Sequence, residues 1–184
     1  MSLIELDGAI TPITVRLLDT AIARARTERA QALVVMLNTP GGLERSMRSM
    51  VQSILNSDIP VIVYVGPTGA RAASAGVFIT MAGHVAAMAP ATNIGAAHPV
   101  AAGGGQMDKE MSKKVENDAA AFARSIATER GRNVEWAEQS GALVGVGHRA
   151  RGGEAQGGGP GGRQRARSPR QDRRPCGEDA EGAP

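Results

Sequence analysis

Two uninterrupted apolar runs constrain the fold of this chain more than any other feature of its sequence. Ala32–Leu37 and Pro60–Val65 contain no charged side chain, and turn residues follow each of them. Such runs are typical of strands in a parallel sheet that is covered on both faces. Residues 3–6 and 85–88 are predicted to form two shorter strands.

Segments with helical periodicity separate these strands. Residues 12–29, 43–56 and 107–130 carry apolar side chains three and four positions apart, with charged residues on the remaining positions. Strands that alternate with helices indicate an α/β layered fold.

Ser74 lies in a turn of small residues, Gly69–Gly76, shortly after the second apolar run. Small neighbours let backbone and substrate approach closely, and the start of a following helix favours negative charge. Several hydrolases present their nucleophile in such a strand-to-helix turn. We therefore interpret Ser74 as a candidate catalytic nucleophile.

A glycine-containing turn, Asn38–Gly42, follows the first apolar run. It is expected at the carboxyl end of a strand, where α/β sheets place their sites. Because glycines leave backbone N–H groups unobstructed, Gly41 and Gly42 form a candidate oxyanion loop, with the N–H groups of Gly42 and Ala75 as donors. The alternative is an ordinary turn, since Pro-Gly pairs are common between elements.

Lys114 is one candidate for the general base. On a helical wheel it lies roughly 90° from the centre of the apolar stripe, between core and solvent, whereas Lys113 faces water. Partial burial would lower the pKa of Lys114 toward that of a useful base, although pairing with Asp118 would oppose this. The alternative is a surface lysine without a catalytic role.

His98 is the other candidate base, because histidine is the commoner partner of a catalytic serine. No carboxylate that would orient it stands out in the sequence. A loop histidine with a satisfied hydrogen bond is an equally compatible interpretation.

The distribution of charge argues against nucleic-acid binding. The net charge is +3, and residues 149–184 account for the excess with eight arginines and five acidic residues. Aromatic residues that could stack on bases are scarce. We also expect no metal and no cofactor, because the sequence has no cluster of metal ligands and Gly103–Gly105 lacks the strand and lysine of a phosphate-binding loop.

Several motifs together resemble the protease domain of NfeD proteins, the ClpP-class membrane-bound serine proteases that are also called stomatin operon partner proteins. The resemblance covers about residues 3–140 and rests on Leu37–Gly42, Pro60–Val65, Gly69–Gly76, Met88–Pro90, Asn93–Pro99 and Ser125–Asn133.

The resemblance implies a ClpP/crotonase-like layered fold of ββα units, with the protease domain at residues 1–140. It implies a serine endopeptidase with a Ser-Lys dyad, in which Ser74 is the nucleophile, Lys114 the general base and Gly41–Gly42 the oxyanion loop. His98 falls near the position of the histidine of ClpP and stays an alternative base. The implied substrates are hydrophobic segments of a stomatin-like membrane protein, and the implied assembly is a homo-oligomer.

Full-length members of this family usually carry a secretion signal and membrane spans, which the resemblance would place with the protease domain outside the cytoplasm. Here we find no leader and no apolar run of about 18 residues, so we expect no membrane span. Residues 141–184 are rich in Gly, Arg and Pro where the family continues with a helix and a strand. We interpret them as a frameshifted reading of a GC-rich gene or as a genuine disordered tail.

Two other functions are compatible with the same residues. One is an inactive or non-catalytic fragment of such a protease, which lacks the final helix and strand. The other is a crotonase-like acyl-thioester enzyme, which would share the oxyanion architecture and would not need a serine at position 74.

Overall fold

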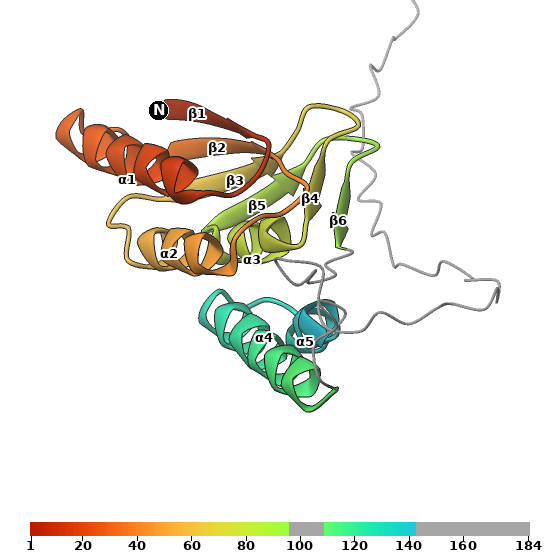
Figure 1. Ribbon diagram of the computed structural model, residues 1–184. Helices are drawn as coiled ribbons and strands as arrows, with labels where there is room; N and C mark the ends of the chain where they lie inside the picture. Colours follow the sequence, from red (N-terminus) through yellow and green to blue (C-terminus); the bar gives the residue numbers. More distant parts are fainter. Residues whose placement is uncertain (96–108, 143–184) are drawn as a thin grey trace, which may run out of the picture. The chain divides into compact units, whose positions relative to one another are not determined.

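The computed structural model describes residues 1–95 and 109–142, which lie within one compact unit, residues 1–148 (Figure 1). The elements follow one another as β1 (Ser2–Asp7), α1 (Pro12–Thr27), β2 (Leu33–Asn38), α2 (Glu44–Leu55), β3 (Val61–Val65), β4 (Arg71–Ala73), α3 (Ala75–Ala82), β5 (Val85–Met88), β6 (Asn93–Gly95), α4 (Lys109–Glu129) and α5 (Val134–Ala142). Almost all of the predicted tail, from residue 143 onward, lies outside the described residues, so the domain boundary at residue 140 stays a prediction.

The main sheet has four parallel strands in the order β1-β2-β3-β5, which confirms the four strands expected from the sequence. Helices α1, α2 and α3 pack on one face of it (Figure 1). On that face, alternate residues of β2 and β3 are completely buried: Leu33, Val35, Leu37, Val61, Val63 and Val65. Helix α3 is buried along its whole length, and all of its residues except Thr80 are apolar or glycine, so it shows no amphipathic period.

The opposite face of the sheet carries apolar side chains that the described residues leave partly exposed. The strand register places Leu3, Val34, Ile62 and Val85 side by side in one row across all four strands. Leu3 is 64% exposed and Val85 is 51% exposed, while Val34 and Ile62 are half-buried. The prediction of a sheet covered on both faces is therefore wrong for the described residues. The apolar runs are continuous because this outward row is also aliphatic, although no helix within residues 1–95 and 109–142 covers it.

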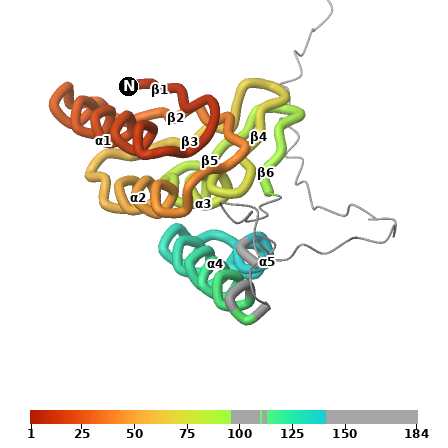
Figure 2. Tube along the Cα trace, in the orientation of Figure 1, coloured from red at the N-terminus to blue at the C-terminus, as the bar shows by residue number. Residues whose placement is uncertain are grey.

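A second, two-stranded parallel sheet pairs β4 with β6, which the sequence analysis did not predict (Figure 2). A parallel bridge between Thr39 and Ala72 connects β4 to the end of β2. This small sheet therefore brings the segment that precedes Ser74 next to the turn that follows β2.

Helices α4 and α5 pack together and join the rest of the domain through side chains of α4 and the turn that follows it. Phe122 stacks on Phe78 of α3 with ring centroids 5.8 Å apart. The Arg130 guanidinium donates to the carbonyls of Ala82 (2.8 Å) and Ile54 (3.3 Å), which lie at the ends of α3 and α2. The Ile54 carbonyl also accepts the N–H of Ser57 (3.3 Å), so Arg130 adds to the pairing of carbonyls at the ends of both helices.

Among the helices within residues 1–95 and 109–142, none combines the length and the apolar character that crossing a lipid bilayer requires.

Candidate active site

Ser74 lies between β4 and α3, in a backbone conformation that is uncommon for a residue with a side chain. Its φ is 51° and its ψ is −113°, and it is half-buried. Non-glycine residues with positive φ are rare, and when the surrounding structure holds them they cluster at functional sites. The conformation matches the strained strand-to-helix turn that presents a nucleophile in hydrolases.

Gly41 packs directly against Ser74. A Cβ atom at position 41 would lie 2.6 Å from the Ser74 Cβ and 3.2 Å from its Oγ, and the φ of Gly41 is +117°. No residue with a side chain fits this position without displacing the serine. The structure therefore brings the predicted oxyanion loop and the predicted nucleophile together.

Ile10 forms hydrogen bonds with the residues on both sides of Gly42. The Ile10 N–H donates to the Gly41 carbonyl (2.8 Å), and the Leu43 N–H donates to the Ile10 carbonyl (2.9 Å). A Cβ at position 42 would lie 2.2 Å from the Ile10 carbonyl oxygen. In a parallel bridge of this kind, the N–H of the middle residue, Gly42, faces away from the neighbouring strand.

The N–H groups of Gly42 and Ala75 are among those in this region that have no hydrogen-bond partner within the described part of the chain. Ala75 is the first residue of α3, so its N–H cannot bond within the helix. The N–H of Gly41, in contrast, donates to the Thr39 hydroxyl (3.1 Å). Of the loop glycines, Gly42 is therefore the one whose N–H stays available for a ligand.

Lys114 is exposed on α4, as is Lys113, so the partial burial expected for Lys114 is not found. The helical wheel is correct for the buried stripe, in which Ala119 and Ile126 are buried. A helical wheel does not show whether a neighbouring element covers a given turn. Near Lys114, in the first turns of α4, the described residues leave the helix exposed.

Asp118, the expected partner of Lys114, forms an ion pair with Arg48 of α2 instead. A cation from another helix thus reaches this carboxylate, and the pair with Lys114 that the sequence allowed is not seen among the described residues. His98 lies outside the described residues, so both candidate bases stay predictions.

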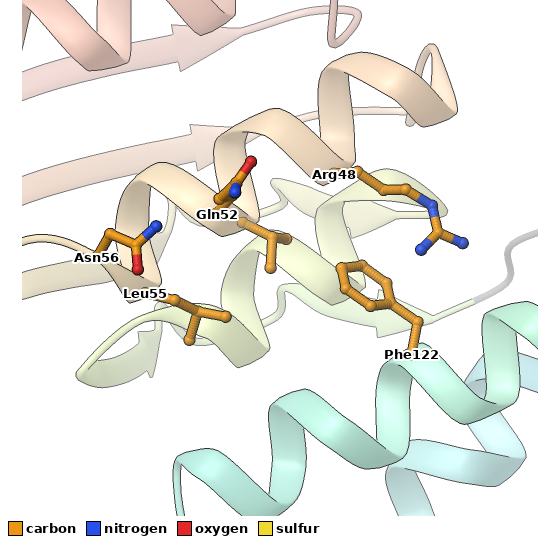
Figure 3. Close-up of a pocket in the computed structure, with 6 residues that line it drawn as sticks. Arg48, Gln52, Leu55, Asn56 and Phe122 are labelled. Atoms are coloured by element: carbon orange, nitrogen blue, oxygen red, sulfur yellow. The ribbon is translucent and has the colours of Figure 1, made fainter.

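A pocket of about 350 Å³ lies between α2 and α4 and is lined by Arg48, Val51, Gln52, Leu55, Asn56 and Phe122 (Figure 3). Arg48 lies over the Phe122 ring, 4.4 Å from its centroid, and also pairs with Glu44. No candidate nucleophile lines this pocket, and its cation is already engaged. We interpret it as a gap in helix packing and place the candidate active site at Ser74.

Sequence reasoning missed Ile10 and Thr39, which fix the two sides of the loop. Thr39 belongs to the motif Asn38–Gly42, but the sequence gives no signal that its side chain is buried. Nothing in the sequence around Ile10 marks it as a partner of the loop. Within residues 1–95 and 109–142, no group of His, Cys, Asp and Glu side chains could hold a metal ion.

A family model described as the N-terminal domain of NfeD1b matches residues 2–144. The membrane-bound protease PH1510 of Pyrococcus horikoshii is 42% identical over 137 residues, which cover 73% of this chain and 31% of that protein. This chain therefore spans about a third of the length of that curated relative.

Solved structures of the 1510-N protease are also similar to this chain. A serine-to-alanine mutant of the 1510-N membrane-bound stomatin-specific protease has 39% identity and a TM-score of 0.69, over 75% of this chain and 67% of that chain. A lysine-to-alanine mutant in complex with a substrate peptide has 38% identity and a TM-score of 0.68, over 75% and 64%. ClpP1 from Listeria monocytogenes, at 20% identity and a TM-score of 0.57 over 76% and 78%, is similar in fold alone. The predicted ClpP-like fold is confirmed.

Proposed function

The chain belongs to the family of NfeD1b N-terminal domains, and we propose that it is a serine endopeptidase domain with Ser74 as its nucleophile. The contact between Gly41 and Ser74 carries this proposal, because it sets a glycine loop with an available N–H beside a serine in a strained turn. A relative that is 42% identical over 137 residues is named a protease, which supports the same reaction for this domain.

In the proposed reaction, the Ser74 hydroxyl oxygen attacks the carbonyl carbon of the scissile peptide bond, and its proton passes to the general base. The N–H groups of Gly42 and Ala75 stabilise the negative charge that develops on the carbonyl oxygen. The C–N bond then breaks, the base returns the proton to the leaving amine, and the acyl group stays on Ser74. The same base deprotonates a water molecule, which hydrolyses the ester and regenerates the serine.

Lys114 is the base that we propose, with His98 as the alternative. The peptide complex of the 1510-N relative was formed by a lysine-to-alanine mutant, and this change would preserve a bound substrate if the lysine were the base. Because Lys114 is exposed in the described chain, the role requires that bound substrate or another segment shields it from water.

The substrate class that we propose is an apolar peptide segment of a stomatin-like membrane protein. The support is the name of the 1510-N relative, a membrane-bound stomatin-specific protease.

Separate replacement of the two candidate bases tests the mechanism. In assays on an apolar peptide, Lys114→Ala should lower kcat by about 10²- to 10⁴-fold. Lys113→Ala, which removes a neighbouring exposed lysine from the same helix, should leave kcat near that of the wild type. A loss of activity in His98→Ala with full activity in Lys114→Ala would assign the base to His98.

We also propose that the domain self-associates through the aliphatic row of Leu3, Val34, Ile62 and Val85. All-parallel sheets are normally covered on both faces, and the described residues leave this row partly exposed. A row of like side chains is self-complementary, as a two-fold interface requires.

A further inference from the structure

Thr39 is a completely buried polar residue at the point where β2 passes into the oxyanion loop, and it has no assigned role. Buried polar groups are normally hydrogen-bonded, so the partners of Thr39 show what it holds in place. Its backbone, its hydroxyl and its methyl group each contact a different part of the candidate active site.

The backbone of Thr39 is tied to β4, the strand that ends one residue before Ser74. The Thr39 N–H donates to the Arg71 carbonyl (2.7 Å), and the Ala73 N–H donates to the Thr39 carbonyl (3.0 Å). Thr39 thereby fixes the position of the strand that carries the nucleophile.

The hydroxyl of Thr39 is tied to the loop glycine that packs on the nucleophile. It accepts a hydrogen bond from the Gly41 N–H (3.1 Å) and donates one to the Gly41 carbonyl (3.1 Å). That carbonyl also accepts the N–H of Ile10. Both peptide groups that flank the Gly41 Cα are therefore held while the residue stays at a φ of +117°.

The methyl group of Thr39 contacts the helix that follows the nucleophile. A Cβ on Gly76, in the first turn of α3, would lie 2.7 Å from the Thr39 Cγ2. Glycine at position 76 and threonine at position 39 therefore allow α3 to start close to the end of β2.

We propose that Thr39 is a positioning residue for the oxyanion site, and this inference rests on the function proposed above. By engaging the N–H and the carbonyl of Gly41, its hydroxyl fixes the orientation of the next peptide group, so that the Gly42 N–H is presented to the substrate oxygen. The same bonds keep the Gly41 N–H from competing for that oxygen. Thr39 touches no reacting atom and acts through Gly41 and Gly42.

Two substitutions separate the hydroxyl from the methyl group. Thr39→Val keeps the branched shape and removes the hydroxyl, whereas Thr39→Ser keeps the hydroxyl and removes the methyl group. A serine-reactive phosphonate is the probe, because its P–O group must occupy the oxyanion site. The rate of labelling of Ser74 should fall by at least about 10-fold in Thr39→Val and stay near the wild-type rate in Thr39→Ser.

Thr80→Val is the matched control, because Thr80 is also a buried threonine and its hydroxyl bonds only a carbonyl within α3. It should leave the labelling rate near that of the wild type. Amide hydrogen exchange, followed by NMR, provides a readout that does not depend on activity. The Gly41 amide should exchange faster in Thr39→Val than in Thr39→Ser or Thr80→Val.

Full-rate labelling of Thr39→Val, or unchanged exchange of its Gly41 amide, would overturn the positioning role. A wild-type protein that is not labelled at all would contradict the proposed function instead. In that case the exchange measurement alone decides whether Thr39 holds the loop.

Discussion

Gly41 and Ser74 constrain each other at the scale of single residues. The serine can adopt its positive φ beside the loop because position 41 carries no side chain. The contact with Ser74 requires glycine at position 41. The sequence motif alone does not show this requirement, since it is also compatible with an ordinary turn.

We therefore expect Gly41→Ala to be inactive, because its Cβ would displace Ser74 in addition to straining the backbone. The positive φ alone costs on the order of 1–3 kcal/mol of stability for an alanine. Gly8→Ala is the matched control, because Gly8 has a φ of +110° and open space around its Cβ position. Both variants should lower the urea midpoint, and only Gly41→Ala should also abolish peptide cleavage. Equal activity in the two variants would show that the contact with Ser74 has no catalytic importance.

Much of the candidate site could be predicted from residue types, and some of it could not. Ser74 and the glycine pair were found because small residues after apolar runs have a direct physical meaning. The burial of Lys114 was predicted wrongly, since a helical wheel describes only one helix and its own periodicity. Thr39 was missed because a threonine before a proline is typical of a turn, and two of its four hydrogen bonds require β4 to lie alongside.

At the scale of elements, the four strands of the main sheet could be predicted from the sequence, and the three-residue strands β4 and β6 could not. β2 and β3 are marked by continuous apolar runs, whereas β4 and β6 have three residues each and consist mainly of small or polar side chains. Such strands are specified by their partners, through contacts such as the bridge from Thr39 to Ala72. Local sequence patterns carry no information about those partners.

The junction between α3 and β5 should respond to pH through His84. Its Nδ1 accepts the N–H of Val61 (3.2 Å), and burial, with a smaller effect of the Arg130 charge, lowers the pKa of His84 below its ordinary value of 6.5. Because the unfolded chain then binds the proton first, the free energy of unfolding should fall as the pH decreases from about 6.5 toward the lower pKa of the folded state.

Urea titrations of the wild type and of His84→Gln, at about pH 7.5 and about pH 5.5, measure this effect. The variant should lose less stability than the wild type over this interval, because its side chain does not titrate. The difference should be small, since burial of His84 is only partial. Identical losses in the two proteins would argue against a contribution from His84.

At the scale of the whole molecule, the outward face of the main sheet changes in character along the strands. The row of Leu3, Val34, Ile62 and Val85 lies toward the amino ends, and a polar pair, Asp7 and Asn38, lies at the carboxyl ends. Asn38 donates to the Asp7 carboxylate (3.0 Å) and accepts the N–H of Arg71 (3.1 Å). The aliphatic row and the polar pair are therefore separate parts of one face.

Replacement of the exposed ends of the aliphatic row should weaken self-association. We expect the double variant Leu3→Lys, Val85→Lys to sediment as a smaller species than the wild type at the same concentration. Ile13→Lys is the control, because Ile13 is an equally exposed aliphatic residue (69%) that lies on α1. If Ile13→Lys has the same effect, added charge and not the row is responsible.

The most direct test of the central proposal is to locate the site of covalent modification by a serine-reactive phosphonate. Intact-mass measurement and peptide mapping of the wild-type protein should find one adduct, on Ser74, and Ser74→Ala should stay unmodified. Blocking of peptide cleavage in proportion to the adduct would link that serine to the activity. An adduct on another residue, or equal modification of Ser74→Ala, would contradict the account.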